Sequence, residues 1–341
     1  MTTRRETWID LVRFLSIFLI VLYHTPPRLL PADEALNFNM NMGVFFCISG
    51  FLFNEQKYGG FSAFFKHRAR QILVPYTVFS LLFYVLWLAA TRGSEGPWWA
   101  PLAQLACGHP ELVCRALWYI ACLFSIQLMY YWIQRAFPGK KAFVATLVVA
   151  AAYIAAGYLV PAEVDIDIPF WHMGNALVFM PFYAAGHCFK PWWRQLRPGP
   201  PRHAAFLAMM WGVAATALLH CQWMSNHHYW GGAYLGLRYA ALLMIPAFVA
   251  LAKWLDARLG RRPAVELVVM SGTFYLAAQN YVIGVARVVL DHAFHPHVMD
   301  DHPWLKLVVA IAVMAILYPL AWLLRRYAPW TLGLKKTHPS I

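Results

Sequence analysis

The sequence has few charged residues and no long polar segment. Only 13% of its 341 residues are Asp, Glu, Lys or Arg, which is about half the fraction found in ordinary soluble domains. No Ser-rich or Gly-rich linker and no charged tail of globular size divides the chain. These absences argue against a soluble multidomain protein, and we predict that residues 1–341 form a single domain.

Metal-binding cysteine motifs are also absent. The six cysteines do not have the spacing of a zinc or cluster site. Four of them, Cys47, Cys122, Cys188 and Cys221, lie in or beside apolar runs, where a free thiol behaves as a small hydrophobe.

What the sequence does have is apolar residues and positive charge. Hydrophobic residues make up 61% of the chain, and the mean hydropathy is +0.50. A bundle of lipid-facing helices needs this much apolar surface, whereas a soluble core does not. The net charge of +13 would suggest nucleic acid in a soluble protein. Here we expect no nucleic acid, because cytoplasmic loops of membrane proteins collect Lys and Arg.

The apolar runs predict an all-α polytopic membrane bundle of about ten transmembrane helices, each needing roughly 20 residues. The second run is short and suits a helix that is buried by protein or one that only partly crosses the membrane, and the ninth is the most polar. The predicted spans are 8–24, 40–54, 74–91, 115–134, 142–160, 170–189, 203–221, 233–252, 264–284 and 304–324.

The basic residues give this bundle an orientation. Alternating the loops between two sides leaves two basic residues within spans, Arg13 and Arg238. Five lie in loops of one side: Arg28, Arg92, Arg115, Arg287 and Lys306. The other 21 of the 28 fall on the side of the N-terminus. The positive-inside rule therefore predicts that both termini are cytoplasmic.

The opposite, external loops are acidic and rich in histidine. One of them contains Cys107 and Cys114 in the segment CGHPELVC. An oxidising compartment would allow a disulfide between them, and two unpaired thiols are the alternative that the sequence leaves open.

The first span, WIDLVRFLSIFLIVLYH, carries the ionisable groups of greatest interest. It follows Arg4 and Arg5, but Asp10 and Arg13 interrupt it and no small-residue cleavage site follows, so we expect a retained helix. Asp10 and Arg13 are three residues apart and can neutralise each other. Arg13 and His24 are eleven apart, about three turns, so they share a face roughly 17 Å apart along the axis. On spacing alone, an ion pair and an interfacial histidine are the simpler interpretation.

Two later segments offer further candidates. In GVFFCISGFLF, Ser49 and Gly50 predict close helix packing; Ser49 as a nucleophile lacks the strand–turn–helix context that such a serine needs. The next segment, FFKHRARQILVPY, is basic. Arg68 and Arg70 there could either lie on anionic lipid or clamp phosphate groups.

Together these residues resemble acyltransferase family three, a family of bacterial membrane acyltransferases. The resemblance rests on the D-x-x-R pair Asp10 and Arg13, the R-x10-H spacing to His24, and the FF-x-I-S-G-F segment 45–51. Two further segments also match the family pattern, namely the basic stretch before Pro75 and the Leu117-Trp118-Tyr119 opening of the fourth span. The motifs occur in order on a matching topology across nearly the whole chain.

The resemblance implies an O-acyltransferase of the bacterial inner membrane, most simply an O-acetyltransferase. Such an enzyme takes an acyl group from cytoplasmic acyl-CoA, with acetyl-CoA as co-substrate and no tightly bound cofactor. It delivers the group to a hydroxyl of a glycan or lipid-linked saccharide beyond the bilayer. The resemblance makes Arg13 and His24 the catalytic pair, with Asp10 supporting their helix and His24 acting as general base or acyl carrier. Arg13 would stabilise the thioester carbonyl or orient the acyl-CoA arm.

This sequence departs from the family pattern at two places. The family has an R-x-x-R motif after the second span; here the register gives Arg68 and Gln71, with Arg70 adjacent, so the second arginine is displaced or missing. These three residues are the predicted acyl-CoA-binding set. Many members have a histidine in the penultimate span, where this chain has Gln279 and Asn280.

The remaining polar candidates are secondary. We expect Ser49, Trp118, His172 and Asn175 to line the cavity of the bundle, and Arg238 either to face a substrate cavity or to pair with an acid. The histidines of the last external loop, at 292, 295, 297 and 302, are irregularly spaced, and we predict a solvated loop and no metal site.

Two rival classes stay open at this stage. A transporter or flippase of a lipid-linked sugar would show paired halves with broken helices, and no such internal symmetry is visible. A non-catalytic membrane scaffold would not need the chemistry of Arg13 and His24.

Overall fold

The computed structural model describes residues 6–27, 41–91, 96–159, 168–199, 232–260 and 262–334, apart from the side chains of 157–159 and 232–244. Every regular element in these residues is a helix. The longer helices are α1 (Thr7–His24), α2 (Met42–Phe51), α3 (Phe61–Thr91), α6 (Trp118–Ala136), α7 (Lys140–Leu159), α8 (Met173–Cys188), α11 (Gly232–Leu259), α12 (Pro263–Met270), α13 (Gly272–Ala293) and α15 (Leu305–Tyr327). The short ones are α4 (Ala100–Ala106), α5 (Glu111–Cys114), α9 (Lys190–Gln195), α14 (Val298–Asp301) and the 3-10 turns η2 (Glu55–Lys57), η3 (Arg115–Leu117), η4 (Phe170–His172) and η5 (Pro329–Leu332).

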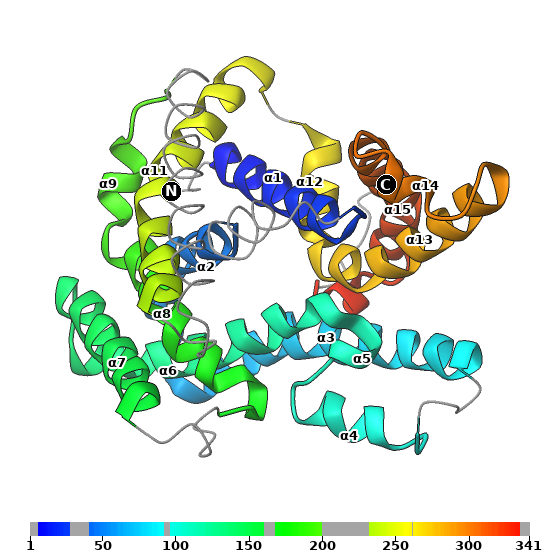
Figure 1. The fold of residues 1–341 in the computed structure, drawn as a ribbon. Coiled ribbons are helices and arrows are strands. Elements are labelled where there is room, and N and C mark those ends of the chain that lie inside the picture. Colours follow the sequence, from blue (N-terminus) through cyan, green and yellow to red (C-terminus); the bar gives the residue numbers. More distant parts are fainter. Residues whose placement is uncertain are drawn as a thin grey trace.

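Helix α1 runs through the interior of the bundle (Figure 1). It contacts α2, α11, α12, α13 and α15. Its apolar residues Val12, Ile17 and Val21 are almost fully buried by these neighbours. A helix enclosed in this way holds its polar side chains among other helices rather than in lipid, which is where ionisable groups inside a membrane are tolerated.

Five of the described helical segments are long and apolar enough to cross a membrane. They are α1, α3, residues Glu111–Ala136, α13 and α15. The outer helices expose large apolar side chains, among them Leu81 and Val85 on α3 and Ile311 and Ile316 on α15. Such extensive apolar surface suits contact with lipid, not water. The chain is therefore an all-helical, multi-pass membrane protein. The count of ten spans stays a prediction, and the predicted span 203–221 lies outside the described residues.

The second predicted span is a short, enclosed helix. Helix α2 has 10 residues, so it is about 15 Å long and cannot by itself cross a hydrocarbon core of about 30 Å. Its Val44, Phe46, Cys47 and Ile48 are buried. The expectation of a short helix buried by protein is confirmed.

Close packing of α2 against α8 depends on two glycines. A Cβ on Gly50 would overlap the carbonyl oxygen of Tyr183, and a Cβ on Gly186 would overlap that of Cys47. Each helix thus presents a glycine to the backbone of the other, the arrangement that small residues permit in membrane bundles. The prediction that Ser49-Gly50 serves close packing is confirmed for Gly50.

The ninth predicted span, 264–284, is wrong in its limits. The helix breaks at Ser271, which has φ −101° and ψ 16°, so that α12 ends at Met270 and α13 begins at Gly272. Ser and Gly are both weaker helix formers than the residues around them, which favours a break at this point. The segment able to span the membrane is Gly272–Ala293.

The basic segment and the third span form one helix. Helix α3 has 31 residues, about 46 Å, so it is longer than the hydrocarbon core is thick. Its first turns, with Arg68 and Arg70, can therefore extend beyond the core on one side. At this end α3 packs against η5 near the C-terminus.

Candidate functional site

His24 is the last residue of α1, and its ring nitrogens are distinguished by their surroundings. Its Nδ1 lies 2.8 Å from the carbonyl oxygen of Ile20, one turn earlier in the helix. A carbonyl can only accept a hydrogen bond, so Nδ1 carries the proton and donates it. In the neutral ring the basic nitrogen is then Nε2. In this tautomer Nε2 is the ring nitrogen able to accept a further proton.

Gln279 of α13 lies beside the same ring. Its side-chain amide nitrogen is 3.5 Å from His24 Nδ1, and the whole residue is buried. Its Oε1 has no hydrogen-bond partner within the described residues. The two ends of an amide are assigned from their surroundings, and turning this one would let Oε1 accept from Nδ1. Gln279 is therefore close enough to contact the His24 ring. The sequence placed it only as the residue found where related chains have histidine.

Arg13 lies on the same helix, three turns before His24. Because α1 is one unbroken helix, the two side chains share a face and are separated by roughly 17 Å along the axis. Arg13 is half-buried. Its guanidinium is close enough to the phenol of Tyr119 in α6 to interact with it electrostatically. The Tyr119 hydroxyl is in turn 3.4 Å from Oγ of Ser49. Arg13, Ser49 and the fourth-span motif are thus brought together inside the bundle.

Asp10 is buried at the opposite end of α1 from His24. It lines a small pocket between α1, α11 and α12 that also contains Asp256, Arg262 and Glu266. At the same end, Thr7 donates a hydrogen bond to Asp256 at 2.9 Å. The supporting role of Asp10 at the start of α1 and its neutralisation by Arg13 both stay predictions.

The three residues predicted to bind acyl-CoA make two different kinds of contact. Arg68 is half-buried, and its guanidinium donates a hydrogen bond to Oε1 of Gln71 at 3.3 Å. It also interacts electrostatically with the phenol of Tyr183 in α8. Its Nε is buried without a hydrogen-bond partner among the described residues. Arg70 is exposed and reaches the carbonyl oxygen of Leu334 at 3.5 Å. Residues two apart point to opposite faces of a helix, whereas residues three apart share one. Arg68 and Gln71 therefore form one site, and Arg70 instead ties α3 to the C-terminal segment.

His172 and Asn175 lie together at the start of α8. Asn175 Nδ2 is 3.5 Å from His172 Nδ1, and the ring of Trp118 is 5.8 Å from that of His172. His172 also contacts Glu111, which the sequence did not single out, at 2.9 Å. Of the remaining cavity candidates, the side chain of Arg238 lies outside the described residues.

The disulfide considered for Cys107 and Cys114 is not formed in this structure, and both thiols are free. Cys107 is exposed at the end of α4, whereas Cys114 is buried at the end of α5. The turn at Gly108 and the α5 helix direct the two thiols into different surroundings.

The histidine-rich loop before α15 is exposed, and its carboxylates contact nearby Arg and His side chains. Arg287 contacts Asp300 at 2.9 Å, and His297 lies 3.6 Å from the same carboxylate. His295 lies 3.6 Å from Asp301. Ion pairs between side chains as exposed as these contribute little to the stability of the fold.

Comparison with known families identifies the chain. The model of acyltransferase family three, described as an acyltransferase domain, matches residues 6–326. The chain belongs to this family. The match contains α1 and extends nearly to the end of α15, so every helix of the site described above lies within it. No curated protein and no solved structure matches the chain significantly. Membership supports a membrane acyltransferase, in agreement with the resemblance carried by Arg13, His24 and the 45–51 segment.

Proposed function

We propose that the protein is an O-acyltransferase, in the simplest case an O-acetyltransferase of the bacterial inner membrane. Cytoplasmic acyl-CoA would be the donor, and a hydroxyl of an exported or lipid-linked glycan the acceptor. The observation that carries the proposal is the state of His24. A histidine with its Nδ1 proton held by the Ile20 carbonyl stands at one end of the helix that carries Arg13, in a chain of an acyltransferase family.

The reaction follows from this arrangement. Nε2 of His24 takes the proton of the acceptor hydroxyl while the hydroxyl oxygen attacks the thioester carbonyl. The carbon–sulfur bond breaks, the acyl group stays on the acceptor oxygen, and the proton passes from His24 to the departing thiolate of CoA. A histidine side chain suits both transfers near neutral pH.

Arg13 and His24 have different tasks in this scheme. Because they are roughly 17 Å apart along α1, Arg13 cannot contact the carbonyl that His24 serves. It orients the acyl-CoA arm instead, deeper in the bundle and close to Tyr119. Acyl-CoA would enter past Arg68, a multidentate donor for phosphate, at the end of α3 where the C-terminal segment packs.

Several contacts support the proposed sidedness. Glu6 pairs with Arg194 at 2.8 Å, and Lys253 donates to the carbonyls of Trp193 and Leu196. These residues belong to loops and helix ends on the side that carries 21 of the 28 basic residues. The positive-inside rule predicts that this side is cytoplasmic. On the other side, Lys306 donates to the carbonyl of Pro27 at 2.8 Å. Each contact therefore joins two segments that the ten-span scheme assigns to the same side of the membrane.

Cysteine-accessibility labelling tests this scheme. In a cysteine-depleted parent, Lys140→Cys and Lys336→Cys are expected to react only after the membrane is permeabilised. Glu95→Cys and Asp165→Cys should react in intact cells, because they lie in loops of the external side. External labelling at 336 would require an odd number of spans and would overturn the scheme.

Arg68→Ala is expected to raise the KM for acyl-CoA by about tenfold to a hundredfold, the value of one charge-assisted contact of about 1.5–3 kcal/mol. Arg70→Ala should have a smaller effect, since its guanidinium contacts Leu334. Lys66→Ala, an exposed cation of the same helix, is the matched control. Steady-state kinetics with varied acyl-CoA measures all three. If Arg68→Ala and Lys66→Ala have the same KM, Arg68 does not bind the donor.

Transfer of label from acetyl-CoA in membranes tests the function as a whole and separates it from its rivals. A flippase would move a saccharide without acylating it, and a scaffold would do neither. In cells, analysis of surface glycans after deletion of the gene should show the loss of one O-acyl substituent.

A further inference from the structure

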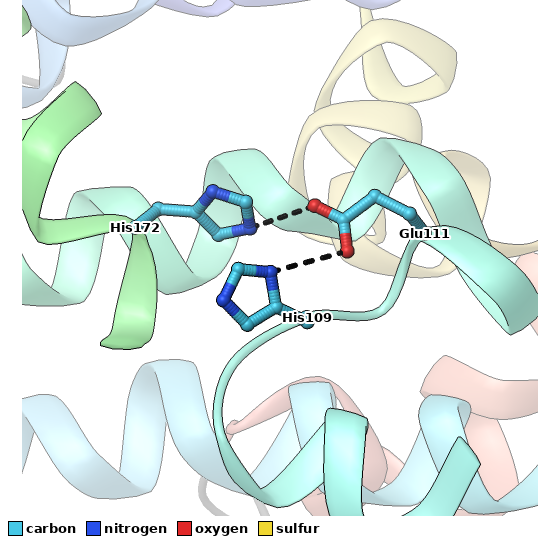
Figure 2. Close-up of side chains that lie close together, drawn as sticks. All are labelled: His109, Glu111 and His172. Atoms are coloured by element: carbon cyan, nitrogen blue, oxygen red, sulfur yellow. Dashed lines mark ion pairs between the residues drawn. The ribbon is translucent and has the colours of Figure 1, made fainter. Parts of the chain in front are cut away.

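Two histidines and a glutamate from distant parts of the chain converge at one end of the bundle (Figure 2). His109 and Glu111 lie where α4 connects to α5, and His172 ends η4 just before α8. The Glu111 carboxylate is 2.9 Å from Nε2 of His172 and 3.6 Å from Nδ1 of His109. Within the described part of the chain, this is the one group of at least three His, Cys, Asp or Glu ligand atoms that lie within 4.8 Å of one another.

The Nε2 atom of His172 is buried and unsatisfied. The residue is 8% exposed, and Nε2 makes no hydrogen bond among the described residues although a carboxylate oxygen is 2.9 Å away. The contact with Glu111 is an ion pair only when the His172 ring is protonated. A ligand placed between the nitrogen and the carboxylate would satisfy both.

The spacing of the three side chains matches a tetrahedral zinc site. Zinc binds imidazole nitrogen and carboxylate oxygen at about 2.0–2.2 Å, which places tetrahedral ligand atoms about 3.3 Å apart. The separations of 2.9 and 3.6 Å, which run to the two different oxygens of Glu111, lie on either side of this value, and one ligand atom from each of the three residues lies within 4.8 Å of the others. Two histidines with one glutamate are also a ligand set that zinc uses when it keeps a fourth position for water or substrate.

The surroundings hold His172 in place and leave the site accessible. Trp171 and His172 both have left-handed backbone, with φ 52° and 51°, and Ser125 donates to the Trp171 carbonyl at 2.8 Å. The Asn175 amide lies 3.5 Å from Nδ1 of His172; with its oxygen turned to that nitrogen it would accept the Nδ1 proton and leave Nε2 for the metal. The Glu111 side chain is 39% exposed, which provides a route from solvent.

We propose that His109, Glu111 and His172 form a zinc-binding site on the external face of the bundle. The site departs from the sequence-based expectation that the chain has no metal site. It ties the α4–α5 connection to the start of α8, segments about 60 residues apart in the sequence. The proposed function does not rest on this site, so failure of the zinc site would leave that proposal untouched.

The site also has a structural connection to the catalytic helix. The Tyr281 hydroxyl of α13 donates to the carbonyl of Val113 in α5 at 2.9 Å. Gln279, on the same helix α13, lies beside His24. Zinc bound at Glu111 therefore orders a loop that packs on the helix positioning the catalytic histidine.

Metal binding by the full-length protein tests the proposal. The protein, purified in detergent without a polyhistidine tag and stripped with chelator, is titrated with Zn²⁺ and separately with Co²⁺. We expect one Zn²⁺ per chain, and visible absorption bands of tetrahedral Co²⁺. Glu111→Gln and His172→Ala each remove a direct ligand. They should weaken binding by about a hundredfold or more, since the loss of an outer-shell partner alone costs 10–100-fold.

Two further variants make the result decisive. His292→Ala removes an exposed histidine from the other external loop and should bind zinc as the parent does. Asn175→Leu should weaken binding by about tenfold, because it removes the partner of Nδ1. If His172→Ala fails to fold, the isosteric Glu111→Gln decides the matter. No zinc bound by the parent at micromolar concentration, or equal affinity in the parent and Glu111→Gln, would overturn the site.

Discussion

Replacing His24 with Ala is expected to lower acyl transfer by roughly a hundredfold or more, the contribution typical of a general base. The change removes the nitrogen that accepts the hydroxyl proton, while Ile20 loses only a side-chain partner for a carbonyl already in a helix. His24 is the last residue of α1, so Ala there should leave the bundle folded. Turnover is measured in membranes with the amount of folded protein determined in parallel.

The Gln variant separates catalysis from packing. His24→Gln keeps a hydrogen-bonding side chain of similar size but cannot take up a proton, so it should be nearly as inactive as Ala. A histidine that only packs or caps the helix predicts the reverse, an active Gln variant and an unstable Ala variant. His292→Ala, in an exposed loop, controls for the loss of any histidine. A well-expressed Gln variant with parental turnover would remove His24 from the mechanism.

Gly50→Ala is expected to prevent normal folding of the bundle. The added Cβ would overlap the Tyr183 carbonyl oxygen, and because that atom belongs to the backbone of α8, no side-chain rotation relieves the clash. Overpacking of this kind costs about 3 kcal/mol at the upper end of its usual range, a large part of the stability of a typical protein. Size-exclusion profiles in detergent should show loss of the monodisperse species, with a lower Tm in what remains.

Two variants bracket this effect. Gly186→Ala should be as damaging as Gly50→Ala, since its Cβ would overlap the Cys47 carbonyl in the same contact. Gly284→Ala, in the interior of α13 with nothing near its added Cβ, should be neutral or slightly stabilising because Ala is the better helix former. Parental stability in Gly50→Ala would show that α2 and α8 are not packed backbone to backbone.

Local patterns in the sequence were enough to predict how several candidate residues lie relative to one another. The eleven-residue spacing of Arg13 and His24 is a property of one helix, so their shared face follows from helical geometry alone. The small pair Ser49-Gly50 predicts close approach for a similarly local reason. The overall class follows from composition, because lipid selects for long apolar helices.

Features made by contacts between distant segments could not be predicted in this way. Gln279 is 255 residues from His24, and nothing in its own neighbourhood marks it as a partner. The zinc ligands are hidden for the same reason, since His172 meets Glu111 only through the packing of α5, α6 and η4. The pairing of Arg68 with Gln71 required the knowledge that α3 is already helical at that point. The break at Ser271 depends on weak local preferences that the apolar pattern obscures.

Acyl transfer across sealed vesicles of known orientation is the most direct test of the central claim. Labelled acetyl-CoA is supplied to the cytoplasmic face of inverted vesicles that contain the acceptor glycan, and the glycan is recovered and its ester-linked label counted. The account predicts label on acceptor hydroxyls with the parent protein and a loss of roughly a hundredfold with His24→Gln. Supplying acetyl-CoA to the external face of right-side-out vesicles should give no labelling. Glycan acylation that proceeds equally with acetyl-CoA on either face, or without His24, would contradict it.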